Sequence, residues 1–115
     1  MPHAVVRAMI YPIHDDDQVT QFTLNQGTIY LDLERYDDDK QDYVPLSVTF
    51  FGVTNLRVDS LSATSITYDP AYRRVLDSEI KGKDVKLLVE WPNRKKHFPL
   101  KVYEFSFQNM NVKGP

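Results

Sequence analysis

The sequence predicts a mainly β protein, an antiparallel β-sandwich or open barrel of about seven to eight strands. Short runs rich in Val, Ile, Thr, Tyr and Phe are separated by turn residues along the whole chain. The pattern offers no series of helices to connect parallel strands, which favours antiparallel pairing. At 115 residues the chain has the size of one domain. We therefore expect residues 1–115 to form a single β-rich domain.

The other predicted strands can be arranged around residues 44–58. The first half of this stretch alternates with the period of a strand that buries one face, at Leu46, Val48 and Phe50. Gly52 interrupts the alternation, which predicts a bulge or a corner where one strand leaves a sheet and another begins. A similar change of parity near Val102 predicts that the last long strand lies beside this stretch and bends with it.

Further strands follow from the same alternation. Residues 19–24 and 28–34 predict a hairpin around the turn Asn25-Gln26-Gly27. The remaining predicted strands are residues 4–13, 60–68, 85–91 and 98–107. Residues 71–80 fit either a strand or the one short helix of the chain, because Tyr72, Val75, Leu76 and Ile80 are three to four residues apart. The tail from Asn109 is expected to be loose.

Composition limits the classes of function. The chain contains no cysteine, which excludes disulfides, thiolate zinc sites and cysteine nucleophiles. Its net charge of −2 argues against broad nucleic-acid binding, which usually needs a basic surface. Patterns typical of serine nucleophiles and of phosphate-binding glycine loops are absent, so we expect no cofactor. The lack of a signal peptide or a long apolar run predicts a cytoplasmic protein without membrane contact.

Two acidic clusters and several tyrosines are the candidate binding residues. Exposed tyrosines bury much area for little entropy at interfaces, and carboxylates attract a basic partner. Each cluster also fits an ordinary solvated turn, and each tyrosine fits a sheet surface. The predicted binding surface comprises Asp15, Asp16, Asp17, Tyr30, Tyr36, Asp37, Asp38 and Asp39.

Metal binding is the alternative for the first cluster. An imidazole and two carboxylates, from His14, Asp15 and Asp17, are a possible ligand set. The second cluster, Asp37–Asp39 with Asp42, could contribute if both clusters lie at one end of the domain. The cationic turn Arg94–His97 fits a phosphate or acidic partner, and equally fits a charged turn that protects strand edges from aggregation.

A His-Asp turn, a strand, a hairpin and then Phe50-x-Gly52-Val53-x-x-Leu56 together resemble small, functionally uncharacterised bacterial β-rich domains. Some of these are grouped with the immunity proteins of polymorphic toxin systems. The resemblance covers roughly residues 14–58. It implies a non-enzymatic cytoplasmic protein that neutralises a toxin by binding it, and such families have no catalytic residues to transfer.

Three functional hypotheses remain from the sequence. The first is a binding protein for another protein, acting through the acidic and tyrosine-bearing surface. The second is a ligand- or metal-binding sandwich, conceivably an enzyme, that uses His14 and the Asp clusters. The third is a structural subunit of a phage or secretion assembly. The sequence leaves the oligomeric state open.

Overall fold

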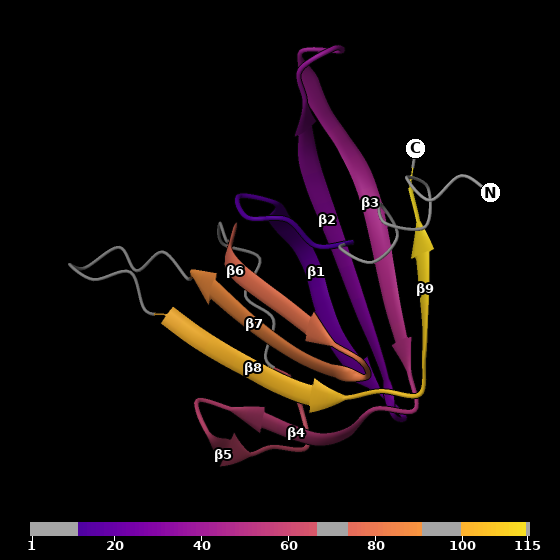
Figure 1. The fold of residues 1–115 in the computed structure, drawn as a ribbon, viewed down its shortest axis with the longest axis vertical. Helices are drawn as coiled ribbons and strands as arrows, with labels where there is room; N and C mark the ends of the chain where they lie inside the picture. Colours follow the sequence, from indigo (N-terminus) through magenta and orange to yellow (C-terminus); the bar gives the residue numbers. More distant parts are fainter. Residues whose placement is uncertain (1–11, 67–73, 91–99, 115) are drawn as a thin grey trace.

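A computed structural model of the chain describes residues 12–66, 74–90 and 100–114. These residues form nine β-strands and no helix (Figure 1). The mainly β prediction is therefore confirmed. The strands are β1 (Gln18–Asn25), β2 (Thr28–Asp37), β3 (Asp42–Phe51), β4 (Thr54–Val58), β5 (Leu61–Ser62), β6 (Arg74–Lys81), β7 (Asp84–Glu90), β8 (Leu100–Ser106) and β9 (Asn109–Lys113).

All nine strands belong to one open antiparallel sheet in the order β5-β4-β8-β7-β6-β1-β2-β3-β9. Strands β3 and β4 are separated by two residues in the chain, yet they lie near opposite edges of the sheet. The same holds for β8 and β9. The sheet must therefore fold across itself into two halves, β1-β2-β3-β9 and β6-β7-β8-β4-β5, whose strands cross obliquely in Figure 1.

The two bent connections meet at one corner. Gly52 has φ of 67°, and the Gln108 amide N–H donates to the Phe51 carbonyl at 2.8 Å. The predicted corner at Gly52 is confirmed, and so is the predicted position of this stretch beside the last long strand, because β4 pairs with β8. The second bend, however, follows Phe107 and not Val102. Phe107 keeps the inward parity of Tyr103 in β8 and is itself buried.

The hydrophobic core fills the space between the two halves. Phe22 of β1 meets Tyr103 of β8 edge-to-face, with ring centroids 4.7 Å apart. Phe50 of β3 meets Phe105 of β8 at 5.0 Å. The predicted inward set of β3 is confirmed, because Leu46, Val48 and Phe50 are all buried. The core thus joins strands that are far apart in the sheet order, and this contact holds the two halves together.

The structure settles one open alternative and corrects two sequence predictions. Residues 74–81 form strand β6, because they close a hairpin with β7 around Gly82 and place Val75 in the core. The tail is ordered, because residues 109–113 pair with β3 and pack Met110 and Val112 against the core. The strand count is nine within the described ranges, because residues 74–81 and the tail are both strands.

Parts of other predictions lie outside the described residues. These parts are residues 4–11 of the first predicted strand, residues 67–68, residues 71–73, and residues 91–99, which include Trp91 and the cationic turn Arg94–His97. Of the predicted strand at 60–68, only Leu61–Ser62 is a strand.

Candidate functional site

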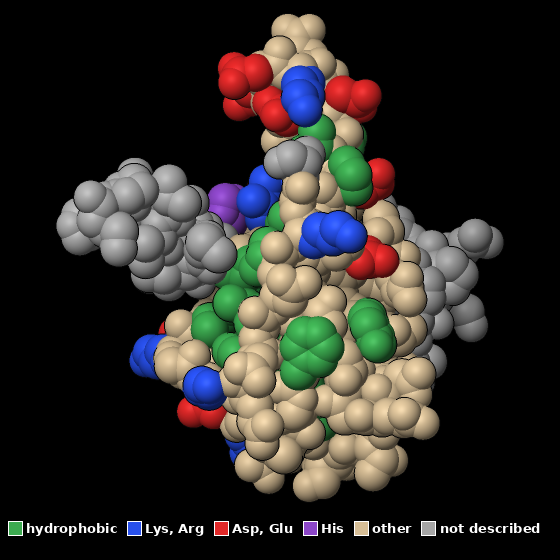
Figure 2. Space-filling model, turned by 90° about the vertical axis from the view of Figure 1, so that its right-hand side faces the viewer, with side chains coloured by type: hydrophobic (Ala, Val, Ile, Leu, Met, Phe, Trp, Pro, Cys, Tyr) green, Lys and Arg blue, Asp and Glu red, His purple; other side chains and the backbone are tan. Residues whose placement is uncertain are grey.

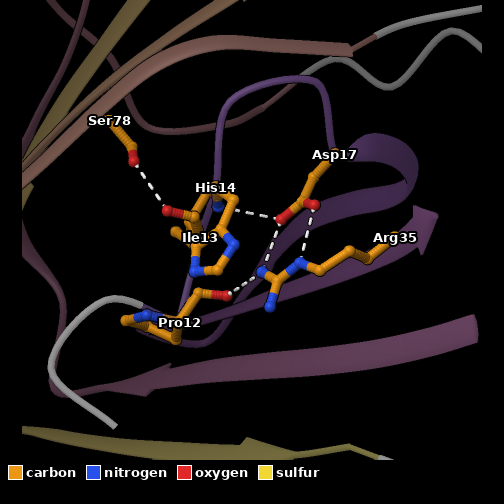
Figure 3. Close-up of polar contacts among 6 residues, drawn as sticks. All are labelled: Pro12, Ile13, His14, Asp17, Arg35 and Ser78. Atoms are coloured by element: carbon orange, nitrogen blue, oxygen red, sulfur yellow. Dashed lines mark hydrogen bonds and ion pairs between the residues drawn. The ribbon is translucent and has the colours of Figure 1, made fainter. Parts of the chain in front are cut away.

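A buried ion pair closes the end of the core where the hairpin of β2 and β3 leaves the sheet (Figure 3). The Arg35 guanidinium donates from Nε to Asp17 Oδ1 at 2.9 Å and from Nη2 to Asp17 Oδ2 at 2.7 Å. Arg35 Nη2 also donates to the Pro12 carbonyl at 2.9 Å. The backbone N–H of His14 donates to Asp17 Oδ2 at 2.9 Å. The Asp17 side chain is only 2% exposed, and these donors satisfy both of its oxygens.

Local sequence places both members of the pair. Arg35 follows Leu31 and Leu33 at the inward parity of β2, so its side chain points along the core face. Asp17 directly precedes β1, whose Gln18 is paired with Glu34. Register therefore brings Asp17 alongside Arg35. An arginine at the inward parity of a strand signals a buried acidic partner, and the register of β1 with β2 is what identifies that partner as Asp17.

The same ion pair removes Asp17 from the candidate metal ligands and from the candidate binding surface. Asp15 and His14 are exposed, and exposed Asp16 lies 3.3 Å from Arg74 Nη1 through its Oδ1. Among the residues that the structure describes, no group of three or more His, Cys, Asp or Glu is placed to hold a metal ion. His14, Asp15 and Asp17 are thus neighbours in the chain that do not converge on one point.

A two-stranded extension projects beyond the rest of the sheet. Strand β1 begins opposite Glu34, and β9 ends opposite Ser47. In the described part of the chain, residues 35–44 therefore pair only with one another, and Figure 1 shows them extending past the neighbouring strands. We call residues 35–44 the hairpin arm. A two-stranded ribbon is marginal by itself in water, so the Arg35–Asp17 pair at its base helps to fix it.

The tip of the hairpin arm carries a concentrated negative charge, visible as the group of acidic side chains at the top of Figure 2. Four aspartates, Asp37, Asp38, Asp39 and Asp42, surround the single cation Lys40. The Asp37 carboxylate accepts the N–H groups of Asp39 and Lys40, at 2.9 and 3.3 Å, which stabilises the turn. Among the described residues, none of the four aspartates forms an ion pair. Their charge is therefore directed at solvent.

Two tyrosines stand on the outer face of the hairpin arm. Tyr36 and Tyr43 are paired in register across β2 and β3. Their rings meet edge-to-face with centroids 5.4 Å apart, and the residues remain 50% and 44% exposed. Gln18 Nε2 donates to the Tyr43 hydroxyl at 3.4 Å. The predicted binding surface omits Tyr43 and Asp42, although these residues are paired with Tyr36 and Asp37 across the hairpin.

The two acidic clusters lie at the same end of the sheet. Asp17 is bonded to Arg35 at the base of the hairpin arm, and Asp37–Asp39 lie at its tip. Tyr30 lies on the same outer face of β2 as Tyr36, six residues nearer the corner. The structure thus gathers Tyr36 and Asp37–Asp39 in the arm, places exposed Asp15 and Asp16 near its base, and puts Tyr30 further down the same face.

The outer face of the other half contrasts with the arm. Its strands align opposite charges in one row, Glu79-Lys86-Glu104-Arg57, across β6, β7, β8 and β4. Arg57 Nη2 lies 3.6 Å from Glu104 Oε2. A shallow depression of about 680 Å³ covers this row. Because the charges on neighbouring strands of this row have opposite signs, they largely cancel. The row therefore attracts a charged partner only weakly.

Comparison of the chain with protein-family models, with curated proteins and with solved structures finds no match. Within residues 12–66, 74–90 and 100–114, no helix is long and apolar enough to cross a membrane.

Proposed function

We propose that this chain is a small, non-enzymatic, cytoplasmic protein that binds another protein through the hairpin arm. The observation that carries the proposal is a projecting ribbon whose tip holds four aspartates without ion pairs among the described residues, beside the exposed pair Tyr36 and Tyr43. A charged surface that only keeps a protein in solution requires neither a projecting ribbon nor two exposed aromatic rings. Tyrosine is among the residues that contribute most to binding energy at protein interfaces.

The charge of the arm indicates the chemistry of its partner. Arg35 is already paired with Asp17, which leaves Lys40 as the only other cation against Asp37, Asp38, Asp39 and Asp42. A negative projection raises the rate of encounter with a basic surface and disfavours an acidic one. The partner that fits is a protein with a basic patch. Neutralisation of a basic toxin, which the immunity-protein resemblance implies, is the specific form of this proposal.

Binding is tested by affinity capture with the immobilised chain, followed by surface-plasmon kinetics on the captured protein. The arm variant is Asp37→Asn/Asp38→Asn/Asp39→Asn. We expect it to lower the association rate about tenfold at low salt, because the electrostatic contribution to encounter is lost. The control Asp77→Asn/Glu79→Gln/Asp84→Asn removes the same charge from exposed residues of the other half, and it should leave the rate within about twofold.

The outcome that contradicts the proposal is equal capture by the wild type and by the arm variant. Melting temperatures of both variants show whether each remains folded. Toxin neutralisation is tested separately, by asking whether the captured protein is toxic to cells and is inhibited by this chain. A captured protein that is not toxic would refute the immunity role and leave arm-mediated binding standing.

The alternative metal-binding function is not favoured by a specific observation. Asp17, one of the three ligands of that hypothesis, accepts hydrogen bonds on both carboxylate oxygens from Arg35 and the His14 backbone N–H. Titration calorimetry with calcium, manganese and zinc tests it directly, and a metal site would also raise the melting temperature increasingly as the metal concentration exceeds the dissociation constant.

A further inference from the structure

We infer that the binding surface continues from the hairpin arm along the outer face of β2 and β3 as far as Tyr30 and Phe51. This inference rests on the proposed function and adds Phe51 as a contact residue. It also specifies the partner: a protein whose contact surface presents cationic residues to the tip of the arm and apolar residues to the aromatic pair Tyr30 and Phe51.

Size is the first argument. The hairpin arm comprises residues 35–44, whereas a stable protein interface takes about 800 Å² from each partner, or about 20 to 30 residues a side. A partner held by the arm alone would have too small a contact for stable binding. The partner must therefore touch a further part of this molecule, and a rigid neighbour of the arm is the natural place.

The distribution of exposed aromatic side chains shows which neighbour this is. Tyr30 and Tyr36 occupy the outward parity of β2, while Tyr43 and Phe51 occupy the outward parity of β3. All four are between 42% and 50% exposed, and they are the exposed aromatic residues of the described part of the chain. Their inward neighbours, such as Phe50, are buried. Within residues 12–66, 74–90 and 100–114, the exposed aromatic area is thus confined to one face of two adjacent strands.

Tyr30 and Phe51 form the second centre of this surface. Tyr30 is paired with Thr49, so Phe51 lies two residues further along β3 on the same face, within reach of the Tyr30 ring. The cross-strand outward residues around them, Thr23, Asn109 and Asn111, are uncharged, and Asp32 is the next outward residue of β2. An aromatic centre bordered by polar side chains fits an apolar contact with hydrogen bonds at its rim.

The exposed aliphatic residues do not form a comparable centre. Leu61 is 72% exposed in the two-residue strand β5. Leu100 is 51% exposed at the start of β8. They belong to the other half of the sheet, whose outer face carries the opposed charges of the Glu79-Lys86-Glu104-Arg57 row. Among the described residues of that half, apolar exposure is therefore scattered, which is ordinary for a protein surface.

The strand geometry fixes the spacing that the partner must match. Eight residues separate Tyr30 from Asp38, and at about 3.3 Å per residue this places the aromatic centre roughly 26 Å from the acidic tip. Asp32 and Glu34 lie between them on the same outward parity. The surface is therefore elongated, with charge at one end and aromatic area at the other.

The test uses a phage-displayed library of random 20-residue peptides, selected on the immobilised wild-type chain. An extended peptide of this length reaches at most about 70 Å, enough to contact both ends. Affinities of the selected peptides are then measured on three variants. The face variant is Tyr30→Thr/Phe51→Thr, in which Thr preserves strand propensity. The arm variant is Asp37→Asn/Asp38→Asn/Asp39→Asn, and the control is Leu61→Thr.

We expect the selected peptides to combine a Lys/Arg-rich block with an aromatic or aliphatic block. The face variant and the arm variant should each weaken binding at least tenfold, and the control should leave it within about twofold. Peptides that bind the face variant as tightly as the wild type, or a selection that enriches no peptide, would overturn the inference. Amide NMR shifts on the wild type provide a readout independent of any variant, and they should change at residues 28–32 and 47–51.

The two proposals fail in different ways. If only the arm variant weakens binding, the proposed function stands and the extension to Tyr30 and Phe51 is wrong. If only the face variant weakens binding, the aromatic centre binds and the arm does not, which refutes the proposed function.

Discussion

The Arg35 guanidinium donates hydrogen bonds to both carboxylate oxygens of Asp17, at 2.9 and 2.7 Å, at the point where the hairpin arm leaves the sheet. The carboxylate is buried, while the arginine side chain is 28% exposed. The pair ties the segment before β1 to the first residue of the arm. Ser78 Oγ of β6 binds the same segment through the Ile13 carbonyl at 2.9 Å. The segment before β1 is thus held by β6 through Ser78 and by β2 through the Arg35–Asp17 ion pair. The same ion pair fixes the base of the hairpin arm, which carries the proposed binding surface.

Loss of this pair should destabilise the whole domain. We expect Asp17→Asn to lower the free energy of unfolding by roughly 2 to 4 kcal/mol, because it leaves the Arg35 charge partly buried and unpaired. Urea denaturation measures the change. In the control Asp16→Asn, the carboxylate is 79% exposed, so its ion pair with Arg74 contributes about 1 kcal/mol at most. Equal effects of the two substitutions would contradict the assigned role of Asp17.

Coupling between the two residues is measured separately by a double-mutant cycle. Arg35→Met alone leaves the buried Asp17 carboxylate without its cation. The double variant Asp17→Asn/Arg35→Met removes both charges with the same substitutions as the single variants, and we expect it to cost less than the sum of the single changes by at least about 1 kcal/mol. Strict additivity in the urea midpoints would show that the two side chains do not interact.

The corner between the halves predicts a difference between two glycines. Gly52 has φ of 67°, and a Cβ there would lie 2.8 Å from the Gln108 side chain. Gly82 has φ of 59° with nothing within 4 Å of its Cβ position. Both alanine substitutions carry the left-handed strain of about 1 to 2 kcal/mol, but Gly52→Ala must also displace Gln108. We expect a lower melting temperature for Gly52→Ala than for Gly82→Ala, and the reverse order would argue against a tightly packed corner.

Substitutions of two adjacent phenylalanines of β3 should distinguish a residue that stabilises the core from one that is available for binding. Phe50 is fully buried against Phe105 and Phe107, whereas Phe51 is 42% exposed. Phe50→Ala should lower the free energy of unfolding by about 3 to 5 kcal/mol, the usual cost of a cavity of that size. Phe51→Ala should cost less than about 1 kcal/mol. Chemical denaturation of both variants checks the contrast, which similar losses would contradict.

Hydrogen exchange should distinguish the hairpin arm from the rest of its strands. Amides of residues 36–43 have only one neighbouring strand among the described residues, whereas those of residues 29–33 lie between β1 and β3. Local opening should therefore expose the arm amides with a lower free energy than the central ones. In Asp17→Asn the difference should widen, because the base of the arm loses its anchor. Uniform protection along β2 and β3 would contradict this view of the arm.

Much of the fold follows from local sequence. Alternation of apolar and polar residues defines most strands, because side chains in a strand point to opposite faces in turn. The hairpin of β1 and β2 follows from its turn residues, and Gly52 marks the corner because few other residues adopt its backbone conformation. The acidic tip and Tyr36 were also recognisable from the sequence, because a run of aspartates and a tyrosine at an outward position of a strand can be read directly from the residue types.

Tertiary structure alone decided the rest. Residues 74–81 had a pattern compatible with helix and strand, and pairing with β7 selected the strand. The tail became β9 because β3 offered it a free edge in register. Asp17 looked like any other member of an acidic turn, and only the neighbouring strand reveals that it is buried on Arg35. Pairing between strands that are distant in the sequence determines which polar side chains become buried. The sequence therefore identifies the acidic residues but does not distinguish the buried Asp17 from the aspartates that remain exposed.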